Sequence, residues 1–380
     1  MDIGERIERR RATPPVANFV VECGVLSPMT HISNPVGRGS TLERLLDALD
    51  PLFDGQLPSN LHLYGPPGAG KSAIVTALFD QLAERLSSGN GQILTTTRAE
   101  SEGGFDFVYI DARRAGTAFK LYRSVLDSLT DEHVPKRGVG TGALRRKLAT
   151  AVEDSNRGVV VAVDHVGEDE TLTAAETESL FDETGDSLAV MTVGRARVEA
   201  SNALEIPAYS THELTDILTE RASRGLRQGV LDHAQVKTLA EWAEGDAHDA
   251  LAALFGTVTL AVGADADRIH DEHLTAGMDA VPRDGVPLGI VLSLPKNRRH
   301  VLAELLELDA SVRVSVETSA TAIAAETDLS AGTVTRYLYE LAEAGVLERV
   351  TSENGTRSGR QPSRLEPRFP TLVFEALNEN

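Results

Sequence analysis

The stretch LHLYGPPGAGKS at residues 61–72 decides the fold. It matches the phosphate-loop pattern G-x-x-x-x-G-K-[ST], with an apolar run before it and the helical pattern SAIVTALFDQLAERL after it. A strand that ends in a glycine-rich turn and leads into a helix directs backbone N–H groups and the positive end of the helix dipole at one point, where a triphosphate can bind. The alternative is a glycine turn at a strand-to-helix junction that binds nothing.

The residues of this phosphate loop have separate expected roles. Gly65, Gly68 and Gly70 permit a backbone path that a Cβ would obstruct. The lysine is expected to reach the β- and γ-phosphates of ATP, and the serine hydroxyl is expected to bind Mg²⁺. We therefore expect nucleotide contacts from the whole loop, that is from Gly65, Pro66, Pro67, Gly68, Ala69, Gly70, Lys71 and Ser72.

Further apolar runs alternate with helical patterns, which predicts an α/β sandwich with a mainly parallel sheet. These runs lie at 105–113, 157–166, 187–194 and 203–209. The run RGVVVAVDHV is almost unbroken, as in a parallel sheet covered on both faces. Its Asp164 is the expected second ligand of Mg²⁺, acting through water, although a carboxylate at a strand end is often only a turn residue. Ligands bind at the carboxyl ends of such strands, so the phosphate loop, Asp164 and residues 192–195 should meet there.

The rest of the chain differs in pattern from this core. The N-terminal residues combine a basic fragment with several prolines, as in an arm that wraps a domain. After Tyr209 the patterns are helical only, and the prolines and glycines of VPRDGVPLG mark a boundary. The predicted domains are an arm at 1–35, a nucleotide-binding core at 36–208, a helical lid at 209–285 and a winged-helix domain at 290–380.

The C-terminal domain follows a different plan. It begins with a helix and a short second helix, and its third helix has Val334, Leu338 and Leu341 on the inward face. The arginine-rich segment TSENGTRSGRQPSR predicts a β-turn wing. In a winged helix-turn-helix the third helix enters the major groove and the wing contacts phosphates, although the same fold also serves protein contacts. The expected contacts to double-stranded DNA come from Thr333, Thr335, Arg336, Tyr339, Arg357, Arg360 and Arg364.

The charge balance is strongly acidic, with a formal net charge of −20. Six lysines against 31 arginines, many carboxylates and only 4% aromatic residues favour a halophilic surface, adapted to very high salt that screens self-repulsion. An acidic mesophilic protein is the alternative. Residues 295–370 carry ten basic and eleven acidic side chains, so the predicted DNA-binding domain is nearly neutral on an acidic chain.

The terminus and the cysteine content indicate where the protein acts. The N-terminal MDIGERIERRR lacks the apolar stretch of a secretory signal, and no apolar run approaches the length of a membrane-spanning helix. The single Cys23 rules out an intramolecular disulfide and fits a reducing compartment. We expect a cytoplasmic protein without a membrane partner.

The order of these parts resembles the archaeal replication initiators of the origin-recognition and cell-division-control (Orc/Cdc) type, which are AAA+ ATPases with a winged-helix domain. The resemblance covers roughly residues 36–370 and is sharpest in GPPGAGKS, VYIDAR, PAYSTHELTDILTERA and GDAHDAL. It implies that Tyr209 packs near the adenine, that Arg221 lines the nucleotide pocket, and that His248 takes the second-sensor position. It also implies binding of origin DNA and recruitment of the replicative helicase.

Several positions depart from the family pattern. His165 follows Asp164 where the family has the glutamate that polarises water, and Glu168 lies too far along the chain to be assumed as its substitute. The first-sensor strand ends in Thr192-Val193-Gly194-Arg195 without an asparagine, and His248 replaces an arginine. His165 and Arg195 are therefore the candidate catalytic residues, and we expect intact ATP binding, weak hydrolysis and a nucleotide that acts mainly as a clamp between core and lid.

Two other functions fit the same residues. One is a nucleotide-switched winged-helix transcription regulator. The other is a catalytically degenerate AAA+ subunit that assembles with active AAA+ paralogues in a hetero-oligomer. Replication initiation and transcription regulation both predict binding of ATP and DNA, so residue chemistry does not separate them. The missing catalytic groups favour the degenerate subunit.

Overall fold

The computed structural model describes residues 19–32, 35–86, 104–130, 134, 138–154, 157–182, 184–185, 187–199, 202–283, 285–351 and 363–378. These residues form two compact units. The first unit comprises residues 31–217 and 243–248, and the second comprises the N-terminal segment to residue 30 with 218–242 and 249–380.

A five-stranded sheet forms the centre of the first unit. Its strands are β1 (Leu61–Tyr64), β2 (Phe105–Asp111), β3 (Gly158–Val166), β4 (Leu188–Gly194) and β5 (Ala203–Glu205). Their order is β2-β3-β4-β1-β5, and every neighbouring pair is parallel. This confirms the predicted α/β sandwich, and β5 is shorter than the apolar run from which it was predicted.

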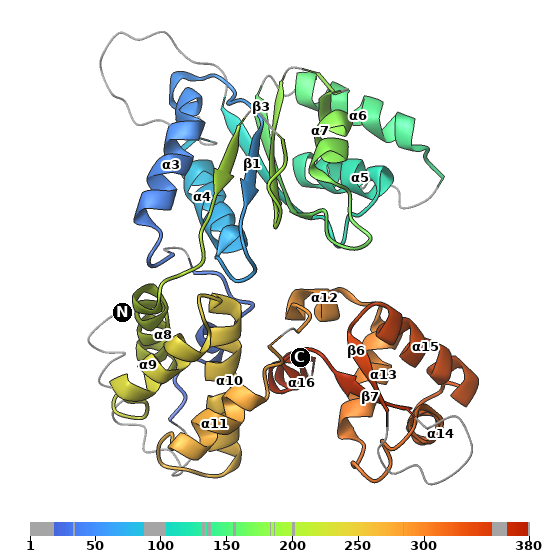
Figure 1. The fold of residues 1–380 in the computed structure, drawn as a ribbon. Helices are drawn as coiled ribbons and strands as arrows, with labels where there is room; N and C mark the ends of the chain where they lie inside the picture. The colour runs from blue at the N-terminus through green and yellow to red at the C-terminus, as the bar shows by residue number, and fades with distance from the viewer. Residues whose placement is uncertain are drawn as a thin grey trace. The chain divides into compact units, whose positions relative to one another are not determined.

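Helices cover both faces of the sheet (Figure 1). One face carries α3 (Gly39–Leu49) and α4 (Lys71–Leu86), with the short 3-10 helix η1 (Asp50–Asp54) between α3 and β1. The other face carries α5 (Ala118–Leu129), α6 (Thr141–Asp154) and α7 (Ala174–Asp182). Successive side chains of β3 point alternately into these two cores, which explains its unbroken apolar run.

After the sheet the chain is helical, as expected for a lid. The helices are α8 (Thr211–Gly225), α9 (His233–Trp242), α10 (Ala247–Gly263) and α11 (Asp271–Asp279). A capping box opens α8, because the Ser210 N–H donates to Glu213 Oε2 (2.8 Å) and the Glu213 N–H donates back to Ser210 Oγ (3.3 Å). Both α8 and α10 contribute residues to each of the two units.

The C-terminal part has the predicted winged-helix architecture. It contains α12 (Leu288–Ser293), α13 (Lys296–Glu307), α14 (Val316–Glu326), α15 (Ala331–Glu343), β6 (Leu347–Thr351), β7 (Ser363–Pro367) and α16 (Thr371–Asn378). Strands β6 and β7 are antiparallel. The three apolar residues predicted on the inward face of α15 are fully buried, and α15 packs against α13 and α14.

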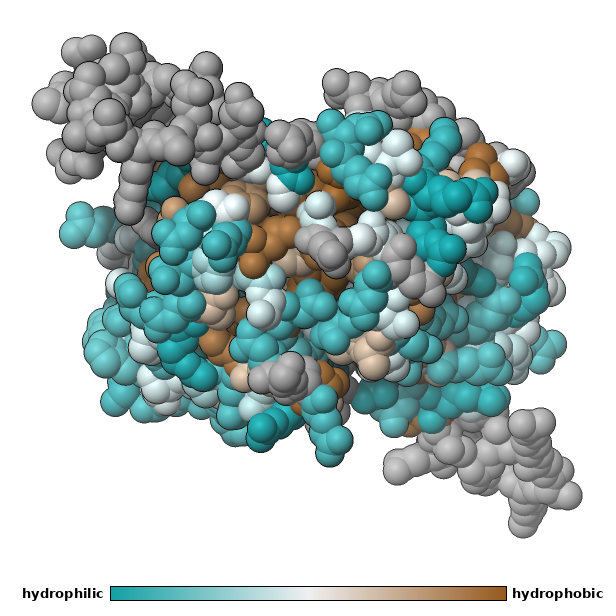
Figure 2. All heavy atoms as spheres, turned by 90° about the horizontal axis from the view of Figure 1, so that it is seen from above, coloured by the Kyte–Doolittle hydropathy of each residue, from teal (hydrophilic) through white to brown (hydrophobic). Residues whose placement is uncertain are grey.

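Hydrophilic residues cover much of the molecular face seen in Figure 2, in keeping with the acidic composition. Within the described ranges, no helix is both long enough and apolar enough to cross a membrane.

Candidate functional site: a phosphate loop at the carboxyl ends of the strands

Two glycines of the phosphate loop are required by its geometry. Gly68 has φ 61° and Gly70 has φ 79°, in the left-handed region that side chains other than glycine rarely adopt. A Cβ at Gly68 would overlap the carboxylate of Asp246, and a Cβ at Gly70 would overlap the hydroxyl of Tyr209. The loop therefore lies directly against these two side chains, and neither glycine tolerates replacement.

Lys71 begins α4 and folds back over its own loop. Its Nζ donates to the carbonyl oxygens of Gly65 (2.8 Å) and Pro66 (2.7 Å). Burial lowers the pKa of Lys71 to about 8, and the nearby carboxylate of Asp164 offsets part of this effect. A partly desolvated ammonium group that is held by two carbonyl oxygens is well suited to bind an incoming anion.

Arg38 joins the phosphate loop to the segment before α8. It is 2% exposed, and its Nη2 donates to the carbonyl oxygens of Ala69 and Pro207, both at 2.7 Å. Its guanidinium stacks on the ring of Tyr209, 3.5 Å from the centroid. Burial raises the pKa of Tyr209, so this phenol stays protonated. The family resemblance implies that Tyr209 packs near the adenine, which stays a prediction. Arg38 was not singled out from the sequence, and its position directly before α3 was the available signal.

The predicted metal-binding residues converge on a tyrosine that sequence reasoning missed. The hydroxyl of Tyr109, on β2, donates to Oδ2 of Asp164 (2.6 Å) and also hydrogen-bonds with Ser72. Asp164 is 1% exposed, and its Oδ1 accepts the N–H of His165 (2.7 Å). Burial and the Asp164 carboxylate raise the pKa of Tyr109, so it remains a donor. These oxygen donors suit Mg²⁺. In FDFVYID every second side chain points to the same face of the strand, and this alternation places Tyr109 on the face of the sheet that α4 covers.

Glu168, in the loop after β3, contacts both His165 at the end of β3 and Arg195 directly after β4. His165 Nδ1 lies 3.3 Å from Glu168 Oε1, and Arg195 Nε lies 3.2 Å from the same oxygen. His165 Nε2 lies 3.6 Å from Asp164 Oδ2. The glutamate that seemed too far along the chain is therefore in contact with the histidine that replaces the family's glutamate, and Arg195 pairs with it within the same chain.

Neighbouring strand ends complete this polar edge. Arg113, just after β2, forms a bidentate pair with Asp111 (2.9 and 2.8 Å). The hydroxyl of Thr192 contacts His62 Nδ1 (2.9 Å) on β1 and is fully buried. Thus the structure brings the phosphate loop, Asp164 and Arg195 to one edge of the sheet, whereas the side chain of Thr192 serves strand packing.

Arg221 has its own partners. It is 5% exposed, and its two terminal nitrogens donate to the carbonyl oxygens of Val25 and Thr30, each at 2.7 Å. Val25 belongs to α2 (Cys23–Leu26), so Arg221 fixes the N-terminal segment that the sequence predicted as a wrapping arm. Its role in lining a nucleotide pocket stays a prediction.

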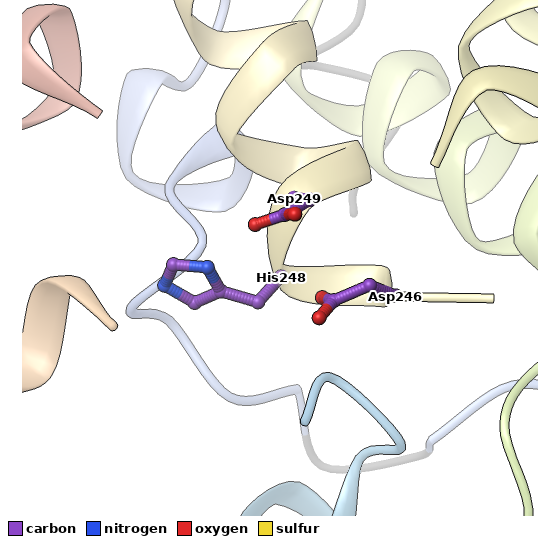
Figure 3. A group of neighbouring side chains, drawn as sticks. All are labelled: Asp246, His248 and Asp249. Carbon is purple, nitrogen blue, oxygen red and sulfur yellow. The ribbon is translucent and has the colours of Figure 1, made fainter. Parts of the chain in front are cut away.

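His248 lies in the first turn of α10 with two carboxylates, Asp246 and Asp249 (Figure 3). The ligand atoms of these three side chains lie within 4.8 Å of one another. Carboxylates at the start of a helix are also favoured by the helix dipole, so the grouping needs no bound metal. The second-sensor role of His248 stays a prediction.

The predicted DNA-binding face on α15 is polar and internally paired. The hydroxyl of Thr333 contacts Ser330 Oγ (2.9 Å), and that of Thr335 donates to the carbonyl of Ala331 (2.8 Å). Arg336 pairs with Glu340 (3.0 Å) and is mostly exposed.

The wing side of this domain shows the same pairing. Arg364 on β7 pairs with Glu366 (2.6 Å). Tyr339 is 36% exposed, and the guanidinium of Arg349 on β6 lies 5.0 Å from its ring centroid. Arg357 and Arg360, also predicted to contact DNA, lie outside the described residues.

The parallel sheet, phosphate loop and winged helix together define an AAA+ ATPase joined to a helix-turn-helix module. The AAA ATPase domain family matches residues 34–193, and the IclR helix-turn-helix domain family matches residues 316–351. These two matches agree with the two regions assigned from the sequence.

The chain is a divergent relative of the archaeal Orc/Cdc6-type proteins. It is 28% identical to ORC1-type DNA replication protein 1 of Sulfurisphaera tokodaii, over 71% of this chain and 68% of that protein. It is 23% identical to ORC1-type DNA replication protein 11 of Haloarcula marismortui, over 91% and 88% of the two chains. The solved structure of the Aeropyrum pernix Orc1 protein in complex with DNA shares its fold, with a TM-score of 0.61, 22% identity and coverage of 95% of this chain and 97% of that one.

Proposed function

We propose that this protein is an ATP-binding and DNA-binding replication initiator of the Orc/Cdc6 type, with weak ATP hydrolysis. The observation that carries the nucleotide part is the convergence of Lys71, Ser72 and Asp164 at the carboxyl ends of a parallel sheet. The relatives support the replication part, because their names are those of DNA replication proteins. The same names favour initiation over the alternative of transcription regulation.

The phosphate loop would bind the triphosphate of ATP, and Ser72 and Asp164 would hold Mg²⁺ with Tyr109 between them. A bound Mg²⁺ supplies positive charge that offsets the phosphates. The protein holds these side chains in place before ATP binds, so that little reorganisation is needed on binding.

Hydrolysis should be weak because the catalytic positions are altered. His165 occupies the place of the expected glutamate and contacts carboxylates on both sides, Asp164 and Glu168. Arg195, the other candidate catalytic residue, is paired with Glu168 in the same chain. We infer that the nucleotide acts mainly as a structural element.

DNA binding would use α15 and the wing. The solved Aeropyrum pernix relative is in complex with DNA, and residues 295–370 of this chain carry a nearly balanced charge on an acidic protein. We further propose recruitment of the replicative helicase or of AAA+ paralogues, as the family resemblance implies. Genome-wide occupancy at one or a few origins would support replication initiation, and occupancy spread over promoters would instead support transcription regulation.

The decisive experiment is calorimetry with ATP and Mg²⁺ in high salt. Wild type should bind ATP, and Lys71→Ala should lose at least about 100-fold in affinity, because a charge-assisted contact to phosphate disappears from a desolvated site. Lys120→Ala is the matched control, since Lys120 is an exposed lysine of the same unit. Absence of ATP binding by the wild type would overturn the proposal.

A further inference from the structure

The backbone after β3 takes an irregular course that returns a side chain to the site. The register of β3 against β4 shifts between Asp164 and Val166, and His165 has φ 64°. The hydroxyl of Thr171 donates to the carbonyl oxygens of Glu168 (2.7 Å) and His165 (3.1 Å), which closes the loop. A bulge of this kind changes the direction of side chains next to functional sites. Here it places Glu168 beside His165.

The two oxygens of Glu168 have different surroundings. Oε1 accepts from His165 Nδ1 (3.3 Å) and Arg195 Nε (3.2 Å). Oε2 is buried and has no hydrogen-bond partner among the described residues, and the side chain as a whole is 11% exposed. A buried carboxylate oxygen without a donor is costly, and such groups in native folds call for an explanation in ligand binding or catalysis.

The charges around Glu168 keep it ionised. Burial raises its pKa, but the hydrogen bond with His165 and the charges of Arg195 and Arg113 outweigh burial, so the pKa lies below its usual value. Glu168 and Asp164 both act electrostatically on Lys71, which places Glu168 within the field of the phosphate loop. Glu168 is therefore an ionised hydrogen-bond acceptor at this edge of the sheet. The position directly after Asp164, where the family has a glutamate, holds His165 instead.

We propose that Glu168, and not His165, is the carboxylate that orients and deprotonates the water attacking the γ-phosphate. This inference rests on the proposed binding of ATP. Glu168 Oε2 accepts one proton of the water as the water oxygen bonds to phosphorus and the bond to the bridging oxygen breaks, which releases ADP with that electron pair and inorganic phosphate. His165 and Arg195 are positioning residues that hold Oε1. Their hold also makes Glu168 a weaker base, which agrees with slow turnover.

The test compares Glu168→Gln, His165→Ala and Glu170→Gln in the full chain at high salt. Glu170 is an exposed glutamate of the same loop and serves as the matched control. Each variant is measured for ATP affinity by calorimetry, for single-turnover cleavage of bound ATP, and for the nucleotide that it retains. Circular dichroism melting curves verify the fold, and Glu168→Asp tests for partial rescue.

We expect Glu168→Gln to bind ATP with nearly wild-type affinity, to cleave it about 100-fold more slowly and to retain ATP where wild type retains ADP. His165→Ala should slow cleavage less, and Glu170→Gln should not change it. Unchanged cleavage in Glu168→Gln, complete loss in His165→Ala alone, or no cleavage by ATP-bound wild type would overturn the assignment. Loss of ATP binding by the wild type would instead overturn the proposed function.

Discussion

The basic side chains beside the phosphate loop and those on the predicted recognition face of the winged helix have opposite surroundings. At the phosphate loop Arg38 is buried, Lys71 is partly buried, and both donate to backbone carbonyl oxygens. In the winged helix, Arg336 and Arg364 are exposed and each is paired with a neighbouring glutamate. Buried charges are screened little by salt, whereas exposed pairs are screened strongly. We infer that salt weakens anion binding less at the phosphate loop than at the predicted DNA-binding face.

The largest effect should come from Arg38→Met, which removes the bridge between the phosphate loop and Pro207. The carbonyl of the fully buried Ala69 and the carbonyl of Pro207 would each lose a donor, so the free energy of unfolding should fall by about 3 kcal/mol in chemical denaturation. Arg44→Met is the matched control, because Arg44 is exposed on α3, and it should change stability by less than about 0.5 kcal/mol. Equal losses in the two variants would contradict the structural role of Arg38.

The pH dependence of binding gives the next largest effect and separates the two regions. Lys71 has its pKa lowered to about 8, and ATP binding needs its protonated form. Affinity for ATP should therefore fall about tenfold from pH 7 to pH 9, as the lysine loses its proton. Arginine stays charged over this range, so DNA binding should hardly change. Calorimetry in buffers of different ionisation enthalpy should detect proton uptake with ATP near pH 8.5, and its absence would contradict the assignment.

Tyr109→Phe should have a smaller and more selective effect. The hydroxyl joins Ser72 and Asp164, so its loss should free the carboxylate to rotate without altering the packing of the ring. We expect the Mg²⁺-dependent gain in ATP affinity to fall about fivefold, the value of one buried hydrogen bond to a charged group, with affinity in EDTA unchanged. Tyr64→Phe is a suitable control, because the hydroxyl of Tyr64 makes a long, 3.5 Å contact to Glu205 at the surface. An equal loss with and without Mg²⁺ would assign Tyr109 a structural role only.

Local patterns in the sequence were sufficient to predict the sheet, the phosphate loop and the winged helix. Apolar runs fix strands buried on both faces, and the glycine spacing fixes the loop, because each signal is carried by neighbouring residues. The inward face of α15 followed from helical spacing alone.

The remaining site residues depend on contacts between distant segments. Arg38 meets Pro207 across 169 positions, and Tyr109 meets Asp164 across 55. Glu168 was set aside because regular spacing would carry it away from Asp164. The bulge at His165 instead turns the chain so that Glu168 lies beside His165. The composition of the strand does not predict such a register shift.

The smallest effect, and the one that most directly tests the comparison, should come from Glu340→Gln. Glu340 accepts from both Arg336 (3.0 Å) and Arg298 (2.7 Å), so it neutralises two arginines beside the predicted recognition face. Its own pKa is lowered chiefly by the hydrogen bond from Arg298, so it is ionised at neutral pH. Removing its charge should free Arg336 for phosphate, raise affinity for duplex DNA about threefold in low salt, and steepen the dependence of log K on log salt by about 0.9. Glu343→Gln, an exposed change near the end of α15, should alter neither quantity. Salt screens the charge of Arg336, so the gain in DNA affinity should disappear in high salt while ATP affinity stays constant. A gain in DNA affinity that persists in high salt would mean that Glu340 acts through the shape of the face and not through its charge.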